Sequence, residues 1–225
     1  MGIQERKDRE KEQRNEEILN AAEKVFFEKG LNAATMDEIA EKAELGKSTL
    51  YLYYKSKEDL YLAVMMRGGE ILYSMFHQAV STGEPTLKLI KNLGDAYYEY
   101  FKQHRDYFRM YYFFENTGLH KQVSEEMIGL CAEHDKKIWT IVFEVIQRAK
   151  EEGMLEASLD PVQAGVILWS NENGLMRQMD RADNYWTDVM RVDLDATIRK
   201  ANAYVLEGMM TEKAKKQFPE LLIEN

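Results

Sequence analysis

Apolar residues recur at intervals of three and four along most of the chain, which is the spacing of amphipathic helices. Only three prolines occur in 225 residues, so few positions forbid a helix. We therefore expect an all-α fold of about nine helices. The approximate bounds of the expected helices are residues 4–29, 35–43, 47–54, 57–80, 86–103, 105–115, 120–152, 161–181 and 187–210.

Local start and stop signals support several of these boundaries. Thr35 and Glu38 have the spacing of a capping box, in which each side chain binds the other residue's backbone amide. Ser56 can cap the long helix that begins at Lys57, and Asp160-Pro161 is a start signature for a later one. Lys29-Gly30 is a typical helix end, which closes the first helix.

The short helices expected at 35–43 and 47–54 are joined by Glu44-Leu45-Gly46, which fits a three-residue turn. We expect Leu45 to point inward and Gly46 to take the unusual backbone conformation that glycine permits. Leu50 and Tyr54 lie four residues apart, so both should pack inward. The rest of the second helix then faces outward or lies at the rim.

This segment carries many residues at fixed spacing: Ile18-Leu19-Asn20-Ala21-Ala22, Phe26, Lys29-Gly30, Thr35, Ile39-Ala40, Ala43, Lys47-Ser48-Thr49-Leu50-Tyr51, Tyr53-Tyr54-Lys55-Ser56-Lys57-Glu58 and Leu60. Over about residues 16–62 the set resembles, without a gap, the DNA-binding domain of the TetR family of transcriptional regulators. Two positions depart from the family pattern. Glu44 stands where the family usually has a turn glycine, and Gly46 stands where it usually has a small polar helix cap.

The resemblance implies that the helix at 47–54 lies in the major groove of double-stranded operator DNA and reads base edges from its N-terminal residues. Lys47 suits guanine acceptors or a phosphate, and the methyl group of Thr49 suits thymine. Taken singly, such side chains are also typical of a solvated helix face. The residues expected to contact DNA are Thr35, Lys47, Ser48, Thr49, Tyr51, Tyr53 and Lys57.

The overall charge runs against a general DNA-binding protein. The chain has 30 basic and 39 acidic side chains, a net charge of −9. Residues 1–67 hold 12 basic against 14 acidic side chains, a net of −2, whereas 68–225 hold 18 against 25, a net of −7. Within 47–57 there are three lysines and no acid. This distribution favours binding to a specific operator over non-specific coating of DNA.

The part of the chain that follows the helix-turn-helix segment concentrates aromatic residues, with ten of its rings between positions 97 and 114. One interpretation is a cavity for a small apolar or aromatic effector, and another is ordinary core together with a dimer contact. Asp95, Glu99 and Glu115 lie among the rings, so a cationic effector is as compatible as a fatty acyl group. The candidate ligand-binding residues are Tyr97, Tyr98, Phe101, Tyr111, Phe114 and Asn171.

Asn171 belongs to a stripe on the helix after Pro161 that becomes polar toward its end. The resemblance implies that the last two long helices pair with those of a second copy in a homodimer. Asn171 would then form a hydrogen bond at the dimer interface, although a ligand contact is the alternative.

Other classes of protein find little support. The four histidines form no metal-binding motif, and the sequence has no phosphate loop and no nucleophile elbow, so we expect no enzyme, no cofactor and no metal. The single Cys131 excludes an internal disulfide and fits a reducing compartment. Residues 5–17 are mostly charged and no apolar run is long enough for a membrane span, so we expect a cytoplasmic protein without a secretory signal.

Together these features predict two domains, an N-terminal arm with a three-helix helix-turn-helix domain (1–56) and a larger helical effector-binding and dimerisation domain (57–225). Residues 4–17 would extend the first helix or form a mobile arm that reaches DNA. The expected function is a repressor that an effector releases from a palindromic operator. The alternatives are an activator or a regulator without an effector, and a helical ligand-binding protein or enzyme that has lost DNA binding.

Overall fold

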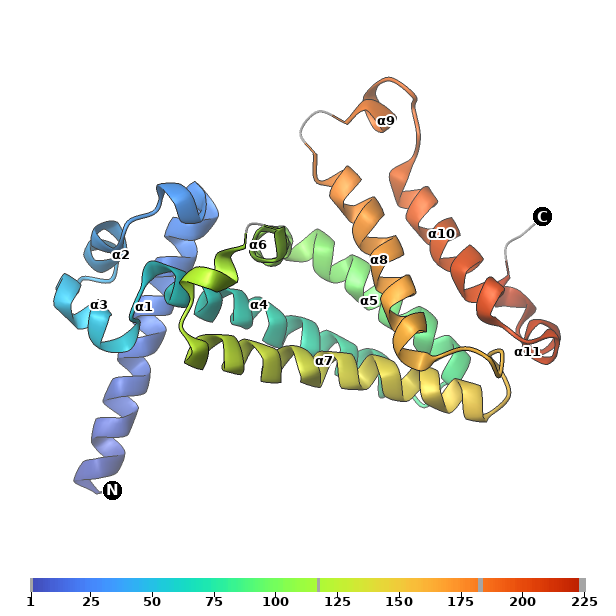
Figure 1. Ribbon diagram of the computed structural model, residues 1–225, viewed down its shortest axis with the longest axis horizontal. Helices are drawn as coiled ribbons and strands as arrows, with labels where there is room; N and C mark the ends of the chain where they lie inside the picture. Colours follow the sequence, from blue (N-terminus) through green and yellow to red (C-terminus); the bar gives the residue numbers. More distant parts are fainter. Residues whose placement is uncertain (1, 117, 182–183, 223–225) are drawn as a thin grey trace. The chain divides into compact units, whose positions relative to one another are not determined.

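The computed structural model describes residues 2–116, 118–181 and 184–222, and in these ranges the chain is almost entirely helical and forms no strand (Figure 1). This confirms the all-α fold class. The α-helices are α1 (Ile3–Ala33), α2 (Met36–Lys42), α3 (Lys47–Tyr53), α4 (Lys57–Val80), α5 (Thr86–Gln103), α6 (Arg105–Asn116), α7 (Glu125–Glu151), α8 (Pro161–Met179), α9 (Tyr185–Asp188), α10 (Leu194–Met209) and α11 (Glu212–Gln217), and the 3-10 helices are η1 (Leu119–Gln122) and η2 (Pro219–Leu221).

The short helices α9 and α11 add to the nine that the sequence predicted, and two expected helices begin later than the pattern suggested. The run expected from 120 starts as η1, and α7 begins only after Ser124, whose hydroxyl accepts the Met127 amide at 3.3 Å. The run expected from 187 likewise becomes α9 and then α10, because Asp193 caps α10 by accepting the Ala196 amide at 2.9 Å. In both places a capping side chain restarts the helix.

The first helix ends where the sequence indicated. Gly30 has φ 70° and ψ 172°, values outside the helical range, so it breaks α1 and leaves one further turn before Ala34. Upstream, residues 4–14 continue α1 as a solvent-exposed helix. A contact of this extension with DNA stays a prediction.

The contacts divide the chain into two compact units. The first consists of the residues up to Glu70 together with His104–Asp135, and the second consists of Ile71–Gln103 together with the residues from Lys136 onward. Both α4 and α7 therefore contribute residues to each unit. The functional boundary expected after residue 56 stays a prediction.

The core of the first unit is built on one face of α1. Ile18, Ala22 and Phe26 are buried there, and the ring of Phe26 meets the edge of the Tyr61 ring on α4 at a centroid distance of 5.1 Å. Gly68 of α4 faces Tyr107 of α6 so closely that a Cβ atom at Gly68 would lie 2.6 Å from the tyrosine side chain. The first unit thus packs α1, α4 and α6 around aromatic rings.

The core of the second unit depends on α5 and α8. The buried residues of α5 fall on one face, as its strong amphipathic pattern predicts, and Phe101 is fully buried. On α8, Gly165 admits the ring of Phe143, which would lie 2.8 Å from an added Cβ atom. In this unit α8 and α10 pack side by side (Figure 1).

Candidate nucleic-acid interface

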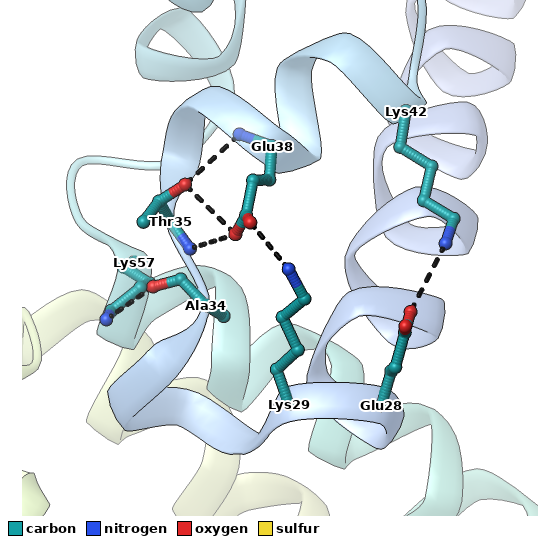
Figure 2. Close-up of polar contacts among 7 residues, drawn as sticks. All are labelled: Glu28, Lys29, Ala34, Thr35, Glu38, Lys42 and Lys57. Atoms are coloured by element: carbon teal, nitrogen blue, oxygen red, sulfur yellow. Dashed lines mark hydrogen bonds and ion pairs between the residues drawn. The ribbon is translucent and has the colours of Figure 1, made fainter.

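Helix α2 begins with the capping box that the sequence predicted. The Thr35 hydroxyl accepts the Glu38 amide at 3.2 Å, and Glu38 Oε2 accepts the Thr35 amide at 3.1 Å (Figure 2). The Thr35 hydroxyl also lies 3.1 Å from the same carboxylate oxygen, to which it donates. The capping box engages the Thr35 side chain, and helix geometry leaves the amides of Met36 and Asp37, in the same first turn, without an intrahelical acceptor.

The turn between α2 and α3 corrects one expectation. Gly46 has an ordinary extended conformation (φ −70°, ψ 142°), whereas Glu44 has φ 56° in the left-handed region. The Leu45 amide donates to Ala40 O at 2.9 Å and the Glu44 amide to Glu41 O at 3.0 Å, which together form a Schellman motif. This motif needs its left-handed residue directly after the helix, at position 44 instead of 46, and the prediction for Gly46 was therefore wrong.

Helix α3 is fixed to the unit by its buried side chains. Leu50 is fully buried and Tyr54 is 7% exposed, as the four-residue spacing predicted. The Tyr54 hydroxyl donates to Asn15 Oδ1 of α1 at 2.8 Å, and burial raises the pKa of Tyr54 to about 12. These contacts orient α3 so that Lys47, Ser48 and Tyr51 are exposed.

The remaining residues expected on the DNA-facing surface are less accessible. Thr49 and Tyr53 are half-buried at the rim of α3. The Lys57 ammonium is partly buried and donates to two carbonyl groups that follow Gly30, Leu31 O at 2.7 Å and Ala34 O at 2.8 Å, the second of which is drawn in Figure 2. Lys57 therefore holds the connection between α1 and α2, and two of its three N–H groups are occupied.

The other lysines of this surface each have an acidic partner. Lys47 Nζ lies 2.8 Å from Asp37 Oδ1, and hydrogen bonding to this carboxylate raises the pKa of Lys47. Lys29 donates to Glu38 at 2.6 Å, and this bond lowers the pKa of Glu38 (Figure 2). Two further pairs complete the set, Lys42–Glu28 at 3.9 Å and Lys55–Glu126 at 2.8 Å.

The candidate ligand-binding rings fall into both units. Tyr97, Tyr98 and Phe101 lie on α5 in the second unit and are buried, whereas Tyr111 and Phe114 lie on α6 in the first unit and are half-buried. In the second unit the Tyr97 hydroxyl donates to Asn173 Oδ1 at 3.0 Å and the Tyr98 hydroxyl donates to Asp195. The hydroxyl groups of Tyr97 and Tyr98 thus have partners within their own unit.

Asn171 belongs to a polar network that the sequence did not reveal. Its side-chain amide donates to Asn202 Oδ1 of α10 at 3.0 Å, and the Asn202 amide donates to Glu172 Oε1 at 2.5 Å. Glu172 is buried, and desolvation raises the pKa of its carboxyl group well above the usual value. Gly94 of α5 makes room for this group, because an added Cβ atom would lie 2.7 Å from Glu172 Oε1.

A second network in the first unit centres on Arg67 of α4. Its guanidinium donates to Asn20 at 2.8 Å and Glu23 at 3.1 Å, and it also bonds Glu16, all on α1. The Tyr107 hydroxyl donates to the same Glu23 carboxylate at 2.6 Å. In the sequence, Arg67 is a lone cation directly after an apolar run from Leu60 to Met66, and this position is the signal for the network.

The described residues hold no cluster of histidine, cysteine, aspartate or glutamate that suits a metal ion.

Cys131 is buried, and desolvation raises the pKa of its thiol to about 12. Within the described ranges, none of the helices combines the length and the apolar character that crossing a bilayer requires.

Comparisons with known proteins agree with this geometry. Residues 18–64 match the family model described as bacterial regulatory proteins, tetR family. The chain is 34% identical to the transcriptional activator FasR of Mycolicibacterium smegmatis over 201 residues, which cover 88% of this chain and 84% of FasR. It is 25% identical to the transcriptional repressor KstR2 of the same species, over 65% of this chain and 70% of KstR2.

A solved structure with the same fold is the regulator FadR from Bacillus subtilis in complex with stearoyl-CoA. It superposes with a TM-score of 0.64 at 16% identity, over 86% of this chain and 98% of FadR. FasR and KstR2 are transcriptional regulators, in agreement with the expectation that the protein is not an enzyme. The matched segment, the extent of the similarity to FasR and the helix-turn-helix geometry together show that the chain belongs to the TetR family of DNA-binding transcriptional regulators.

Proposed function

We propose that the protein is a homodimeric repressor whose two α3 helices enter successive major grooves of a palindromic operator, about 34–36 Å apart. The observation that carries this proposal is the orientation of α3. Leu50 and Tyr54 anchor the helix from below, while Lys47, Ser48 and Tyr51 project from the opposite side into solvent. A short helix held in this way can present its N-terminal side chains to base edges.

The proposed contacts follow from the accessibility of each group. Lys47, Ser48 and Thr49 would reach bases, while Tyr51 and Tyr53 would lie along the phosphates. At the start of α2, the contact expected of Thr35 would come from the free amides that follow it. Lys57 would offer its third N–H group to a phosphate, while its other two hold Leu31 and Ala34 in place.

The proposed dimer is formed by α8 and α10. Val162, Val166 and Ile167 of α8 are each about half exposed, and Tyr204 of α10 is 62% exposed. Val162 and Val166 are one helical turn apart, so they form an apolar strip that a second copy can cover. Asn171 lies on the same helix but already bonds Asn202 within its own unit. The network therefore supports a role of Asn171 in joining α8 to α10.

We further propose two functional domains, the DNA-reading part at 1–56 and an effector-binding part at 57–225. Helix α4 would couple them, since it contributes residues to both compact units. An effector releases DNA only if it prefers the conformation that does not fit the operator. The buried rings of α5 suit an apolar or aromatic molecule, and stearoyl-CoA, the ligand of the FadR structure, is a reasonable first probe.

A second candidate function is transcriptional activation. It is favoured by the similarity to FasR, which is named as an activator and matches most of this chain. A reporter gene under the target promoter separates the two functions. Deleting the regulator raises reporter expression if it represses and lowers expression if it activates.

The DNA-binding proposal is tested by selecting bound sequences from a randomised duplex library with the purified protein. We expect a palindromic site, with each half-site contacted by one α3 helix. Lys47→Ala should remove base preference at one position of each half-site and weaken binding there by about 1–3 kcal/mol. If wild-type protein enriches no sequence, the proposal fails, and a helical ligand-binding protein becomes the better interpretation.

A further inference from the structure

The exposed lysine at the start of α3 is not free in the absence of DNA. Lys47 Nζ contacts both carboxylate oxygens of Asp37, at 2.8 Å and 2.9 Å, so the pair is bidentate. Both side chains are solvent-exposed, Lys47 at 51% and Asp37 at 67%. Among the described residues, Lys47 is the one side-chain partner of the Asp37 carboxylate.

The Lys47–Asp37 pair matters for DNA binding because few positive charges surround α3. No arginine occurs between Arg14 and Arg67, so lysines alone supply positive charge around α3. Each lysine from residue 28 to residue 57 is bonded to an acceptor within the protein, and the five pairings are Lys29–Glu38, Lys42–Glu28, Lys47–Asp37, Lys55–Glu126 and Lys57 with two carbonyl groups (Figure 2 shows three of them). DNA therefore meets cations that already have partners.

These partners differ in how easily DNA can replace them. Glu38 bonds the Thr35 amide and hydroxyl as well as Lys29, so removing its carboxylate would also uncap α2. The partners of Lys57 are two backbone carbonyl groups, and both hydrogen bonds are partly buried. The Asp37 carboxylate, in contrast, accepts no capping hydrogen bond and sits on the surface beside the residue expected to read bases. Compared with Glu38 and with the carbonyl partners of Lys57, the Asp37 carboxylate is the partner that DNA can displace without disturbing the fold.

We propose that Asp37 is a positioning residue for DNA recognition, which holds Lys47 in the free protein and surrenders it to an oxygen of the operator on binding. This inference rests on the proposed function of α3. To contact DNA, Lys47 must give up its ion pair with Asp37, so the contact adds less affinity than that of a lysine without an acidic partner. The same exchange penalises contacts of Lys47 with DNA that lacks a well-placed acceptor.

The test is a comparison of Asp37→Asn with Glu41→Gln in the full-length protein. Glu41 is an exposed acid on the same helix, so its replacement makes the same change in net charge without releasing Lys47. We expect Asp37→Asn to tighten operator binding more than Glu41→Gln does, by about 1.5-fold to fivefold per half-site, the range typical of exposed ion pairs. Binding is measured by fluorescence anisotropy with a labelled operator duplex.

A double-mutant cycle shows whether the effect passes through Lys47. In a Lys47→Ala background, Asp37→Asn and Glu41→Gln should change operator affinity equally, because no lysine remains to be released. If the oxygen that receives Lys47 belongs to a phosphate, the dependence of log K on log salt should also become steeper in Asp37→Asn than in Glu41→Gln, by up to about 0.9 per half-site. A purely structural role of Asp37 would produce neither the coupling nor the change in slope.

The outcomes separate this inference from the proposed function. Equal effects of Asp37→Asn and Glu41→Gln in a protein that selects an operator overturn the exchange alone. Weaker operator binding by Asp37→Asn also overturns it, and would make the intact pair the group that reads DNA. If the wild-type protein selects no sequence, the proposed function fails, and the same comparison on an arbitrary duplex still decides whether DNA competes with Asp37 for Lys47.

Discussion

Glu44 occupies a backbone position that favours glycine, and this gives a quantitative prediction. It is the left-handed residue of the Schellman motif that ends α2, with φ 56°. For a residue with a Cβ atom this conformation costs roughly 1–2 kcal/mol. Glycine avoids that cost but loses more conformational entropy on folding, by about 0.4–1 kcal/mol. Glu44→Gly should therefore stabilise the protein by about 0.8 kcal/mol, the difference between the midpoints of these two ranges.

The assay is thermal unfolding followed by circular dichroism at fixed protein concentration. For a chain of this length, about 1 kcal/mol shifts Tm by about 2–4 °C, so we expect a rise of about 1–4 °C for Glu44→Gly. Glu44→Ala is the matched control, because it removes the same exposed carboxylate and keeps the Cβ atom. Its Tm should stay within about 1 °C of wild type, as is usual for surface substitutions. If Glu44→Ala stabilises as much as Glu44→Gly, the gain comes from charge and the argument from backbone strain is refuted.

Two further predictions concern buried or partly buried charges. The raised pKa of Glu172 means that its contribution to stability is fully present below its ordinary value of 4.5 and is lost as pH rises through the folded-state pKa. Glu172→Gln, which keeps the acceptor for Asn202, should therefore gain stability over wild type as pH increases from 5 to 8, and a Tm difference that is constant with pH would contradict this. Lys57→Met should lower the free energy of unfolding by about 1–3 kcal/mol in urea titrations, because it removes two charge-assisted hydrogen bonds to backbone carbonyls. Lys55→Met, which breaks only an exposed pair with Glu126, should cost about 0–1 kcal/mol, and equal losses in the two variants would show that the carbonyl contacts of Lys57 contribute little.

Local signals in the sequence predicted most of the helix-turn-helix correctly. The capping box of Thr35 and Glu38 and the break at Gly30 lie where the sequence placed them, and so does the start of α8 at Asp160, outside the helix-turn-helix. Each depends on groups within about four residues, so neighbouring side chains and backbone hydrogen bonds are sufficient to specify it. The inward packing of Leu50 followed from helical spacing for the same reason.

Predictions failed or stayed incomplete where a partner is distant along the chain or where one boundary depends on another. The end of α2 had to be known before the left-handed position could be assigned to Glu44 instead of Gly46. The aromatic rings between 97 and 114 looked like one group in the sequence, but α5 and α6 belong to different compact units. The restart of α7 at Ser124 was missed because an apolar pattern alone does not reveal a cap.

By itself the sequence determined the helical class and most helix ends, because periodicity and capping act over a few residues, and its resemblance to the TetR family indicated the helix-turn-helix segment. Only the tertiary structure decided the state of the charged groups. Lys47 is held by Asp37 across the turn, Lys57 is held by carbonyls more than twenty residues away, and Glu172 is buried beneath α5 and α10. The physical reason is that the energy of a charge depends on its solvent exposure and on its neighbours in space, and a linear pattern specifies neither.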